Sequence, residues 1–298
     1  MVLLVALLPV IALLLFIYFV DRYQHEPWSQ IFKGVGLGAL SALVVVTFLM
    51  MLNISFNPYS MVGALGDAFI NAAIPEEAGK LLMLWLLLRN NKYYDEYFDG
   101  IVYAVCVGLG FAGLENIVYL IEDPDWVQIG IARGLLSVPA HFLFAVAMGY
   151  YYSLVHYQCH TTENEARFNK LCVIGVPVLL HGSYDACLMV MQASLADHPE
   201  VSALCAVGFI ATCVFMAVFA FKKCRRLLAA DKAYFDQLAQ QQMATYWNEQ
   251  QDQPQSQQPN PSQPAGYWDG QQNQSPINDY WNNQQNQQPT SGYWDNQQ

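Results

Sequence analysis

The stretch IPEEAGKLL, residues 74–82, places three ionisable side chains inside an apolar run that is long enough to cross a membrane as a helix. A charged side chain at the centre of a bilayer costs about 3 kcal/mol or more, so it persists where it faces a polar cavity or a partner. Glu76 and Lys80 share one helix face, and Glu77 also lies within reach of Lys80. We therefore expect both carboxylates to point into one functional cleft. The alternative is a buried Glu–Lys pair that only holds two helices together.

Apolar segments of this kind recur along most of the chain, which has 298 residues, 54% of them hydrophobic and 12% charged. Each is long enough to cross about 30 Å of hydrocarbon at about 1.5 Å per residue. The first begins at Met1 without a basic region or a small-residue cleavage site, which favours a retained helix over a signal peptide. The sequence predicts an all-α fold, a polytopic transmembrane helix bundle of about seven helices. The segments are 2–20, 31–53, 61–89, 98–121, 127–157, 171–192 and 201–221.

Proline and glycine mark where these helices should bend and pack. The third and fifth segments are longer than one straight crossing needs, and they contain Pro75 and Pro139 respectively. Because proline lacks a backbone N–H, we expect both segments to be kinked or broken. Glycines are dense in the second and fourth segments, which indicates close helix packing. They are Gly34, Gly36, Gly38, Gly100, Gly108, Gly110 and Gly113.

The basic residues predict the orientation. They gather in alternate loops and after the last segment, and cytoplasmic loops carry such an excess of Lys and Arg. The other loops hold only Arg133. We therefore expect the N-terminus outside and the C-terminal end in the cytoplasm. The basic residues counted are Arg22, Lys33, Arg89, Lys92, Arg167, Lys170, Lys222, Lys223, Arg225 and Arg226.

Composition divides the chain into a transmembrane domain, 1–229, and a Gln/Asn-rich acidic tail, 230–298, that we expect to be disordered because it cannot build a core. Four Tyr-Trp pairs, starting at positions 246, 267, 280 and 293, punctuate the tail. Spaced aromatic residues on a polar chain are typical of self-association or partner binding. A neutral extension is the alternative.

Other classes of site have little support. The net charge of −11 and the lack of a basic surface argue against nucleic-acid binding. The seven cysteines show no C-x-x-C spacing, and most lie in apolar runs, where they act as packing residues. The loop group His156, Cys159 and His160 is a weak candidate for metal binding.

Further polar residues lie within three other apolar segments. They are Glu115 and Asn116 in the fourth, His141 in the fifth, and His181 and Asp185 in the sixth. His181 and Asp185 are four residues apart and share one helix face. With alternating helix directions, these residues and Glu76 fall near one depth, at or just outside the middle of the bilayer. The sequence thus predicts a single site in the outer half of the membrane.

Two kinds of chemistry suit such a set of residues. Imidazoles and carboxylates can hold Zn²⁺ with an open position and lower the pKa of its bound water, while a further Glu accepts a proton. Without metal, a buried Glu can activate water while His stabilises the oxyanion. Both routes lead to hydrolysis. A serine mechanism is weak, because no G-x-S-x-G motif occurs.

Four motifs in this order resemble the PrsW family of intramembrane proteases, which is distantly related to CAAX prenyl endopeptidases. EEAGK at 76–80 resembles the family's E-E-x-x-K signature, and the segment 111–116 resembles its F-x-x-x-E-N motif. His141 and the stretch 181–185 resemble its two later His motifs. The resemblance covers about 60–190 of the chain.

The resemblance implies a multi-pass enzyme of the bacterial inner or cytoplasmic membrane that cleaves a membrane protein, such as an anti-sigma factor, on the outer side. It leaves open whether Zn²⁺ or another metal is needed; if so, His141, His181 and Glu115 would be the ligands. The implied catalytic residues are Glu76, Glu77, Glu115, His141 and His181, and the supporting residues are Lys80, Asn116 and Asp185.

Two alternatives to this function remain at this point. One is a CAAX-type protease that matures prenylated proteins or peptides, with a site open toward the cytoplasmic leaflet; the expected depth argues against it. The other is a transporter of ions or protons, or a membrane scaffold, in which the same residues relay protons or bind an ion.

Overall fold

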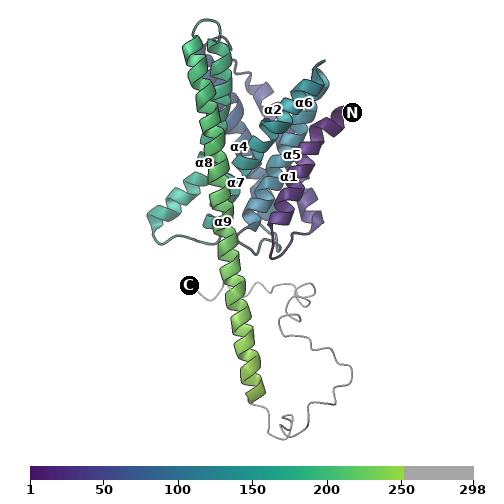
Figure 1. The fold of residues 1–298 in the computed structure, drawn as a ribbon, viewed down its shortest axis with the longest axis vertical. Helices are drawn as coiled ribbons and strands as arrows, with labels where there is room; N and C mark the ends of the chain where they lie inside the picture. Colours follow the sequence, from purple (N-terminus) through teal and green to yellow (C-terminus); the bar gives the residue numbers. More distant parts are fainter. Residues whose placement is uncertain (252–298) are drawn as a thin grey trace. The chain divides into compact units, whose positions relative to one another are not determined.

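The computed structural model describes residues 1–251, and within them every regular element is helical, which confirms the all-α prediction (Figure 1). The chain divides into two compact units, Met1–Asp231 and Lys232–Gln298. The elements are α1 (Val2–Val20), α2 (Trp28–Leu52), α3 (Met61–Gly66), the π-helix η1 (Asp67–Ala73), α4 (Ile74–Leu88), α5 (Asp99–Glu122), α6 (Trp126–Leu135), α7 (Ser137–His156), α8 (Glu163–Ser194) and α9 (Pro199–Gln251).

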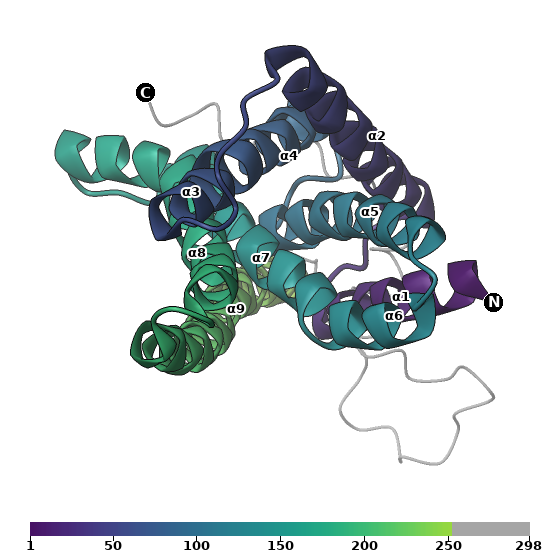
Figure 2. The ribbon, with the colours of Figure 1, turned by 90° about the horizontal axis from the view of Figure 1, so that it is seen from above.

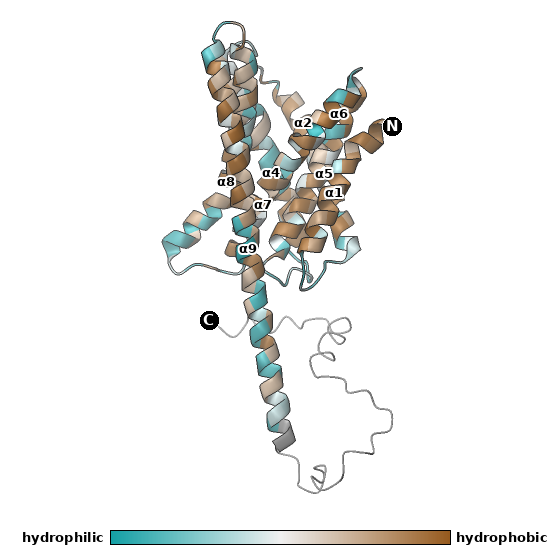
Figure 3. Ribbon diagram, viewed as in Figure 1, coloured by the Kyte–Doolittle hydropathy of each residue, from teal (hydrophilic) through white to brown (hydrophobic). Residues whose placement is uncertain are grey.

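Six helical stretches are long and apolar enough to cross a membrane. In Figure 3 apolar colour covers most of α1 and the upper part of α9, whereas the lower part of α9 is largely hydrophilic. The predicted third segment, 61–89, is not one of the six, because it is divided among α3, η1 and α4, of 6, 7 and 15 residues. The six are Val2–Val20, Trp28–Leu52, Asp99–Ile121, Trp126–His156, Glu163–Ser194 and Pro199–Asn248.

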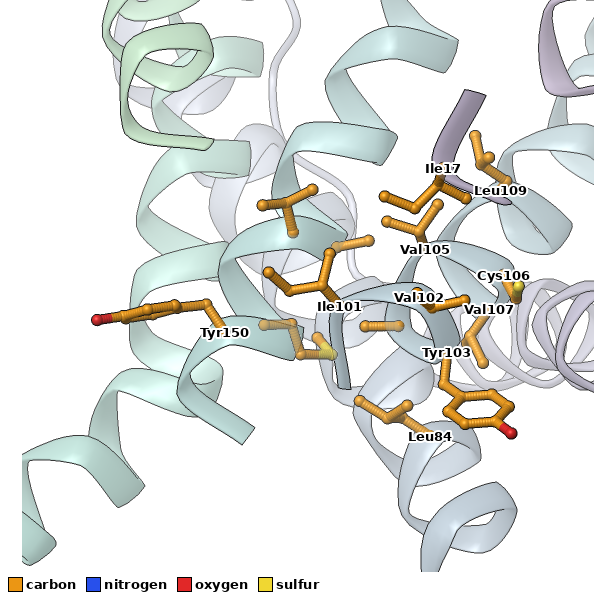
Figure 4. Close-up of a cluster of buried hydrophobic side chains, with 14 of the residues drawn as sticks. Ile17, Leu84, Ile101, Val102, Tyr103, Val105, Cys106, Val107, Leu109 and Tyr150 are labelled. Atoms are coloured by element: carbon orange, nitrogen blue, oxygen red, sulfur yellow. The ribbon is translucent and has the colours of Figure 1, made fainter. Parts of the chain in front are cut away.

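Helix α5 is the central helix of the first unit, with α1, α2 and α7 packed around it (Figure 2). Glycines allow the close approach: a Cβ at Gly38 of α2 would lie 2.0 Å from the carbonyl oxygen of Val107, and one at Gly110 of α5 would lie 2.1 Å from that of Val35. The predicted close packing at these glycines is therefore confirmed. Side chains of α5 such as Ile101, with neighbours from α1, α4 and α7, form the buried apolar cluster in Figure 4.

Both proline-containing segments depart from a regular α-helix, each in its own way, although 61–88 is helical without a gap. In η1 the backbone widens, and the N–H of Ile74 bonds to the carbonyl of Phe69, five residues back. Pro75 follows as the second residue of α4, a position where its missing N–H is tolerated. The break between α6 and α7 lies at Leu136, and Pro139 sits in the first turn of the new helix.

The last helix is longer than the sequence indicated. We expected regular structure to end near residue 229, but α9 continues to Gln251. The reason is that 222–245 is rich in Ala, Leu, Lys, Arg and Gln, all good helix formers, although it is too polar to span a membrane. Of the Tyr-Trp pairs, the one at 246 lies on α9; those at 267, 280 and 293 are outside the described residues.

Candidate active site

Side chains from five helices of the first unit meet in one polar network. It includes every site residue expected from the sequence, and successive partners lie 2.7 to 3.5 Å apart. Helices α4, α5, α7 and α8 supply the expected residues, and Arg133 of α6 links Asn116 to the others. The expected residues are Glu76, Glu77, Lys80, Glu115, Asn116, His141, His181 and Asp185.

Lys80 occupies the centre of the network and is almost fully buried. Its Nζ donates to Oε1 of Glu77 at 2.7 Å and lies 3.0 Å from Nδ1 of His141 and 3.5 Å from Oε2 of Glu76. The ammonium also lies 4.2 Å from the ring centroid of Phe111, which is a cation–π distance. One cation thus offsets much of the cost of burying two carboxylates.

His141 is held from both sides of its ring. Nδ1 faces the Lys80 ammonium, and Nε2 lies 2.9 Å from Oε2 of Glu115. An ammonium can only donate a hydrogen bond and a carboxylate can only accept one. His141 is therefore a neutral imidazole with its proton on Nε2, in a fixed orientation.

His181 has the opposite surroundings, because carboxylates face both of its ring nitrogens. Nδ1 lies 2.9 Å from Oε1 of Glu77, and Nε2 lies 3.1 Å from Oδ2 of Asp185 and 4.0 Å from Oε2 of Glu76. Two ionised carboxylates are both satisfied only by an imidazolium with two N–H groups. The ring stacks on Phe144 with a centroid distance of 4.6 Å. His181 thus supplies a second, well-oriented positive charge.

The two adjacent glutamates differ in exposure, contrary to the expectation that both point into one cleft. Both lie in the first turn of α4, directly after Pro75. Glu76 lines a cavity, whereas Glu77 is fully buried and is not part of the cavity wall. The physical reason is the rotation of about 100° between neighbouring helical residues. Glu77 instead joins Lys80 to His181.

The cavity beside Glu76 has a volume of about 310 Å³. One part of its wall is polar, and apolar residues of η1, α6, α7 and α8 form the rest. A substrate chain placed there would meet the polar groups and an apolar surface together. The polar wall residues include Glu76, Glu115, Arg133, His141, His181 and Asp185, and the apolar ones include Ala72, Leu136, Leu188 and Met189.

Arg133 is the site residue that the sequence reading missed. Its Nη2 lies 3.0 Å from Oε2 of Glu115, and its Nε donates to Oδ1 of Asn116 at 2.8 Å. Asn116 in turn donates from Nδ2 to the carbonyl oxygen of Ala6 in α1. The signal was present, because Arg133 is the one cation within the fifth apolar segment, but we assigned it to a loop.

The arrangement does not fit a metal ion, although His and Glu are ligand types that Zn²⁺ uses. Within residues 1–251, no three His, Cys, Asp or Glu side chains are placed so that they could hold one metal. The ring nitrogens of His141 and His181 have other partners, and the Lys80 ammonium lies between His141 and Glu77. This result also covers the loop group His156, Cys159 and His160.

Comparison with known proteins gives a consistent result. A family model described as "PrsW family intramembrane metalloprotease" matches residues 26–220. The Protease PrsW of Clostridioides difficile is 35% identical over 192 residues, which are 63% of this chain and 79% of that protein. The Protease PrsW of Bacillus subtilis is 34% identical over 186 residues, 62% of this chain and 81% of that protein. No solved structure matches.

Proposed function

The chain belongs to the PrsW family of intramembrane metalloproteases, and from this premise we propose that it hydrolyses a peptide bond of a membrane protein with Glu76 as the general base. It is accordingly an enzyme, an intramembrane protease with several membrane-spanning helices. This family assignment sets aside the transporter and scaffold alternatives.

The observation that carries the proposal is the position of Glu76 on the cavity wall beside two cations. Its Oε2 lies 3.5 Å from Nζ of Lys80 and 4.0 Å from Nε2 of His181. Its side chain is 14% exposed, so a water molecule in the cavity can reach the carboxylate. Glu77, which is fully buried, holds both cations in place and does not meet the substrate.

In this mechanism Glu76 removes a proton from water as the water oxygen attacks the carbonyl carbon of the scissile bond. General-base catalysis of this kind contributes roughly 10²- to 10⁴-fold to the rate. The imidazolium of His181 lies on the same cavity wall. Its two N–H groups stay on Glu77 and Asp185, so it offsets the negative charge that develops on the carbonyl oxygen through its positive charge. Glu76 then returns its proton to the leaving amine. The nitrogen–carbon bond breaks, and the products are a carboxylic acid and an amine, which ionise to a carboxylate and an ammonium.

No step in this scheme passes through a metal ion, because the described donors do not converge on one point. Elemental analysis of the detergent-purified protein, beside a His141→Ala/His181→Ala double variant, is the direct check. One Zn²⁺ per chain that is lost in the double variant would overturn the scheme and mean that the helices rearrange to gather the ligands.

We also propose which substrate is cleaved and on which side of the membrane. We place the cut in the outer half of the bilayer, in an anti-sigma-factor-like membrane protein, with the N-terminus outside and the C-terminus in the cytoplasm. The distribution of Lys and Arg among the loops supports this orientation. We propose that the Tyr-Trp tail associates with other copies of itself or with a partner, because several spaced aromatic residues on one chain can bind at the same time.

The test is cleavage of a membrane-anchored reporter in proteoliposomes by the wild type and by Glu76→Gln. The variant should lose at least about 100-fold in kcat. Glu163→Gln is the matched control, because its side chain is 90% exposed on α8. Near-normal cleavage by Glu76→Gln would exclude Glu76 as the base.

A further inference from the structure

Arg133 lies in the last turn of α6, at the edge of the cavity, and has contacts that the proposed mechanism does not use. Its guanidinium lies 4.0 Å from the ring centroid of Tyr119, while its Nη2 and Nε contact Glu115 and Asn116. The side chain is only 16% exposed. The cation–π contact, the ion pair with Glu115 and the hydrogen bond from Nε to Asn116 together fix its position.

One oxygen of Glu115 is shared by two residues. Oε2 accepts a hydrogen bond from Nε2 of His141 at 2.9 Å and forms the ion pair with Nη2 of Arg133 at 3.0 Å. The Glu115 side chain is 20% exposed and borders the cavity. Without Arg133, this carboxylate could rotate into the cavity and leave the imidazole.

Such a rotation would also disturb the contacts of the glutamates of α4. Glu115 fixes the proton of His141 on Nε2, and this leaves Nδ1 free to accept from Lys80. Lys80 in turn holds Glu77 and lies beside Glu76. A chain of contacts thus runs from α6 through α5 and α7 to α4.

We propose that Arg133 is a positioning residue for peptide-bond hydrolysis, which holds Glu115 against His141 and thereby sets the place of Lys80 beside Glu76. The inference rests on the proposed function. It assigns to α6 a part in the reaction that neither the motifs nor the family comparison assigns to it.

The shape of the contact requires an arginine. Glu115 and Asn116 are neighbours on α5, and the Nη2 and Nε atoms of one guanidinium reach both of them. The single ammonium of lysine supplies the charge but cannot reproduce this fork. The Arg133→Lys variant should therefore keep part of the activity, because its ammonium can still pair with Glu115.

The experiment compares Arg133→Ala, Arg133→Lys and Arg167→Ala in the reporter assay in proteoliposomes. Loss of a residue that orients an active-site group costs roughly 10- to 100-fold in activity. We expect Arg133→Ala to lose this much in kcat with KM within about twofold of the wild type. Arg133→Lys should be intermediate. Arg167→Ala is the control, because the Arg167 side chain is 76% exposed on α8.

Two further measurements separate positioning from a purely structural role. Millimolar guanidinium, far below denaturing concentrations, should restore part of the kcat of Arg133→Ala. A Glu115→Gln/Arg133→Ala double variant should be no less active than Glu115→Gln alone, because Arg133 acts through Glu115.

Wild-type kcat in Arg133→Ala would overturn the inference, as would additive losses in the double variant. A loss of kcat that neither lysine nor guanidinium restores would also overturn it. The proposed function fails separately, through an active Glu76→Gln variant.

Discussion

The ammonium of Lys80 lies 3.0 Å from Nδ1 of His141, a residue 61 positions further along the chain, and so joins α4 to α7 in the interior of the bundle. The contact gives one buried cation two tasks. It neutralises the glutamates of its own helix, and it orients an imidazole on another helix.

Replacing Lys80 by Met should therefore reduce stability as well as activity. Removing one partner of a buried ion pair costs about 3–5 kcal/mol, and Glu77, which is fully buried, would keep only His181 as a cationic partner. Thermal denaturation in detergent is the measurement. The double variant Lys80→Met/Glu77→Gln should recover part of the lost stability, and no recovery would show that the pairing is not the cause.

Glu76→Gln and Glu77→Gln are expected to have different effects. Glu76 faces the cavity, so its amide variant should lose roughly 10²- to 10⁴-fold in kcat while the melting temperature changes little. Glu77 is buried between Lys80 and His181, so its amide variant should melt at a lower temperature. Equal melting temperatures for the two variants would contradict this division.

A separate group of buried carboxyl groups lies in the loops of the first unit. Both carboxylate oxygens of Asp21, and both of Glu96, lack a hydrogen-bond partner within the described chain. Burial, followed by repulsion from Asp231 and Asp95, raises the pKa of Asp21 to about 7. Burial is also the main cause that raises the pKa of Glu26 to about 8.

Stability should consequently fall as the pH rises. Since the folded pKa values exceed the ordinary values of 3.8 and 4.5, the folded state binds protons more tightly than the unfolded state. This contribution is complete below about pH 4 and is lost as the pH passes through about 7 to 8. The melting temperature should decline between about pH 4 and 8 and level off above that range. Asp21→Asn should flatten the decline, whereas the exposed control Asp197→Asn should not.

Two glycines of one helix provide a matched test of helix packing. A Cβ at Gly38 would lie 2.0 Å from the carbonyl oxygen of Val107, while one at Gly36 would meet nothing within 4 Å. Gly38→Ala should destabilise the protein by about 1–3 kcal/mol or more, because backbone cannot yield. Gly36→Ala should raise stability by up to about 1 kcal/mol through helix propensity. Similar unfolding curves for both variants would rule out the close α2–α5 contact.

The position of Asp231 predicts where the chain can be shortened. Its carboxylate accepts hydrogen bonds from the backbone N–H groups of Tyr97 and Phe98, just before α5. Truncation after Gln251 should leave hydrolysis of a short soluble peptide intact. Truncation after Arg226 should lower the melting temperature. Asp231→Ala should account for about 1 kcal/mol of that loss, as expected for a capping interaction.

The composition of the site could be predicted from the sequence because ionisable residues are rare inside apolar helices. Glu76, Lys80, Glu115, His141 and His181 stand out for that reason, and the structure brings them together. Which of these side chains face the cavity could not be predicted. Helical periodicity gives the angle between adjacent residues, but it does not say which of them meets the cavity.

Two parts of the structure differ from the sequence-based expectation. Arg133 was counted with the loops in assigning the orientation although it lies within the segment 127–157, and its partner Glu115 lies on another helix and cannot be found from local sequence. The polar end of α9 was expected to be disordered because it lacks apolar runs, although its helix propensity is high.

The π-helix η1 determines how far α4 is rotated about the helix axis relative to α3. A turn closed by a bond five residues back contains one residue more than an α-helical turn, and each residue corresponds to about 100° of rotation. Helix α3 exposes Val62 and Leu65, while α4 turns Glu77 and Lys80 inward. Deleting a single residue from η1 would rotate the exposed face of α3 by about that angle relative to the inward face of α4. One inserted residue therefore determines how the exposed face of α3 is oriented relative to the buried face of α4 that carries Glu77 and Lys80.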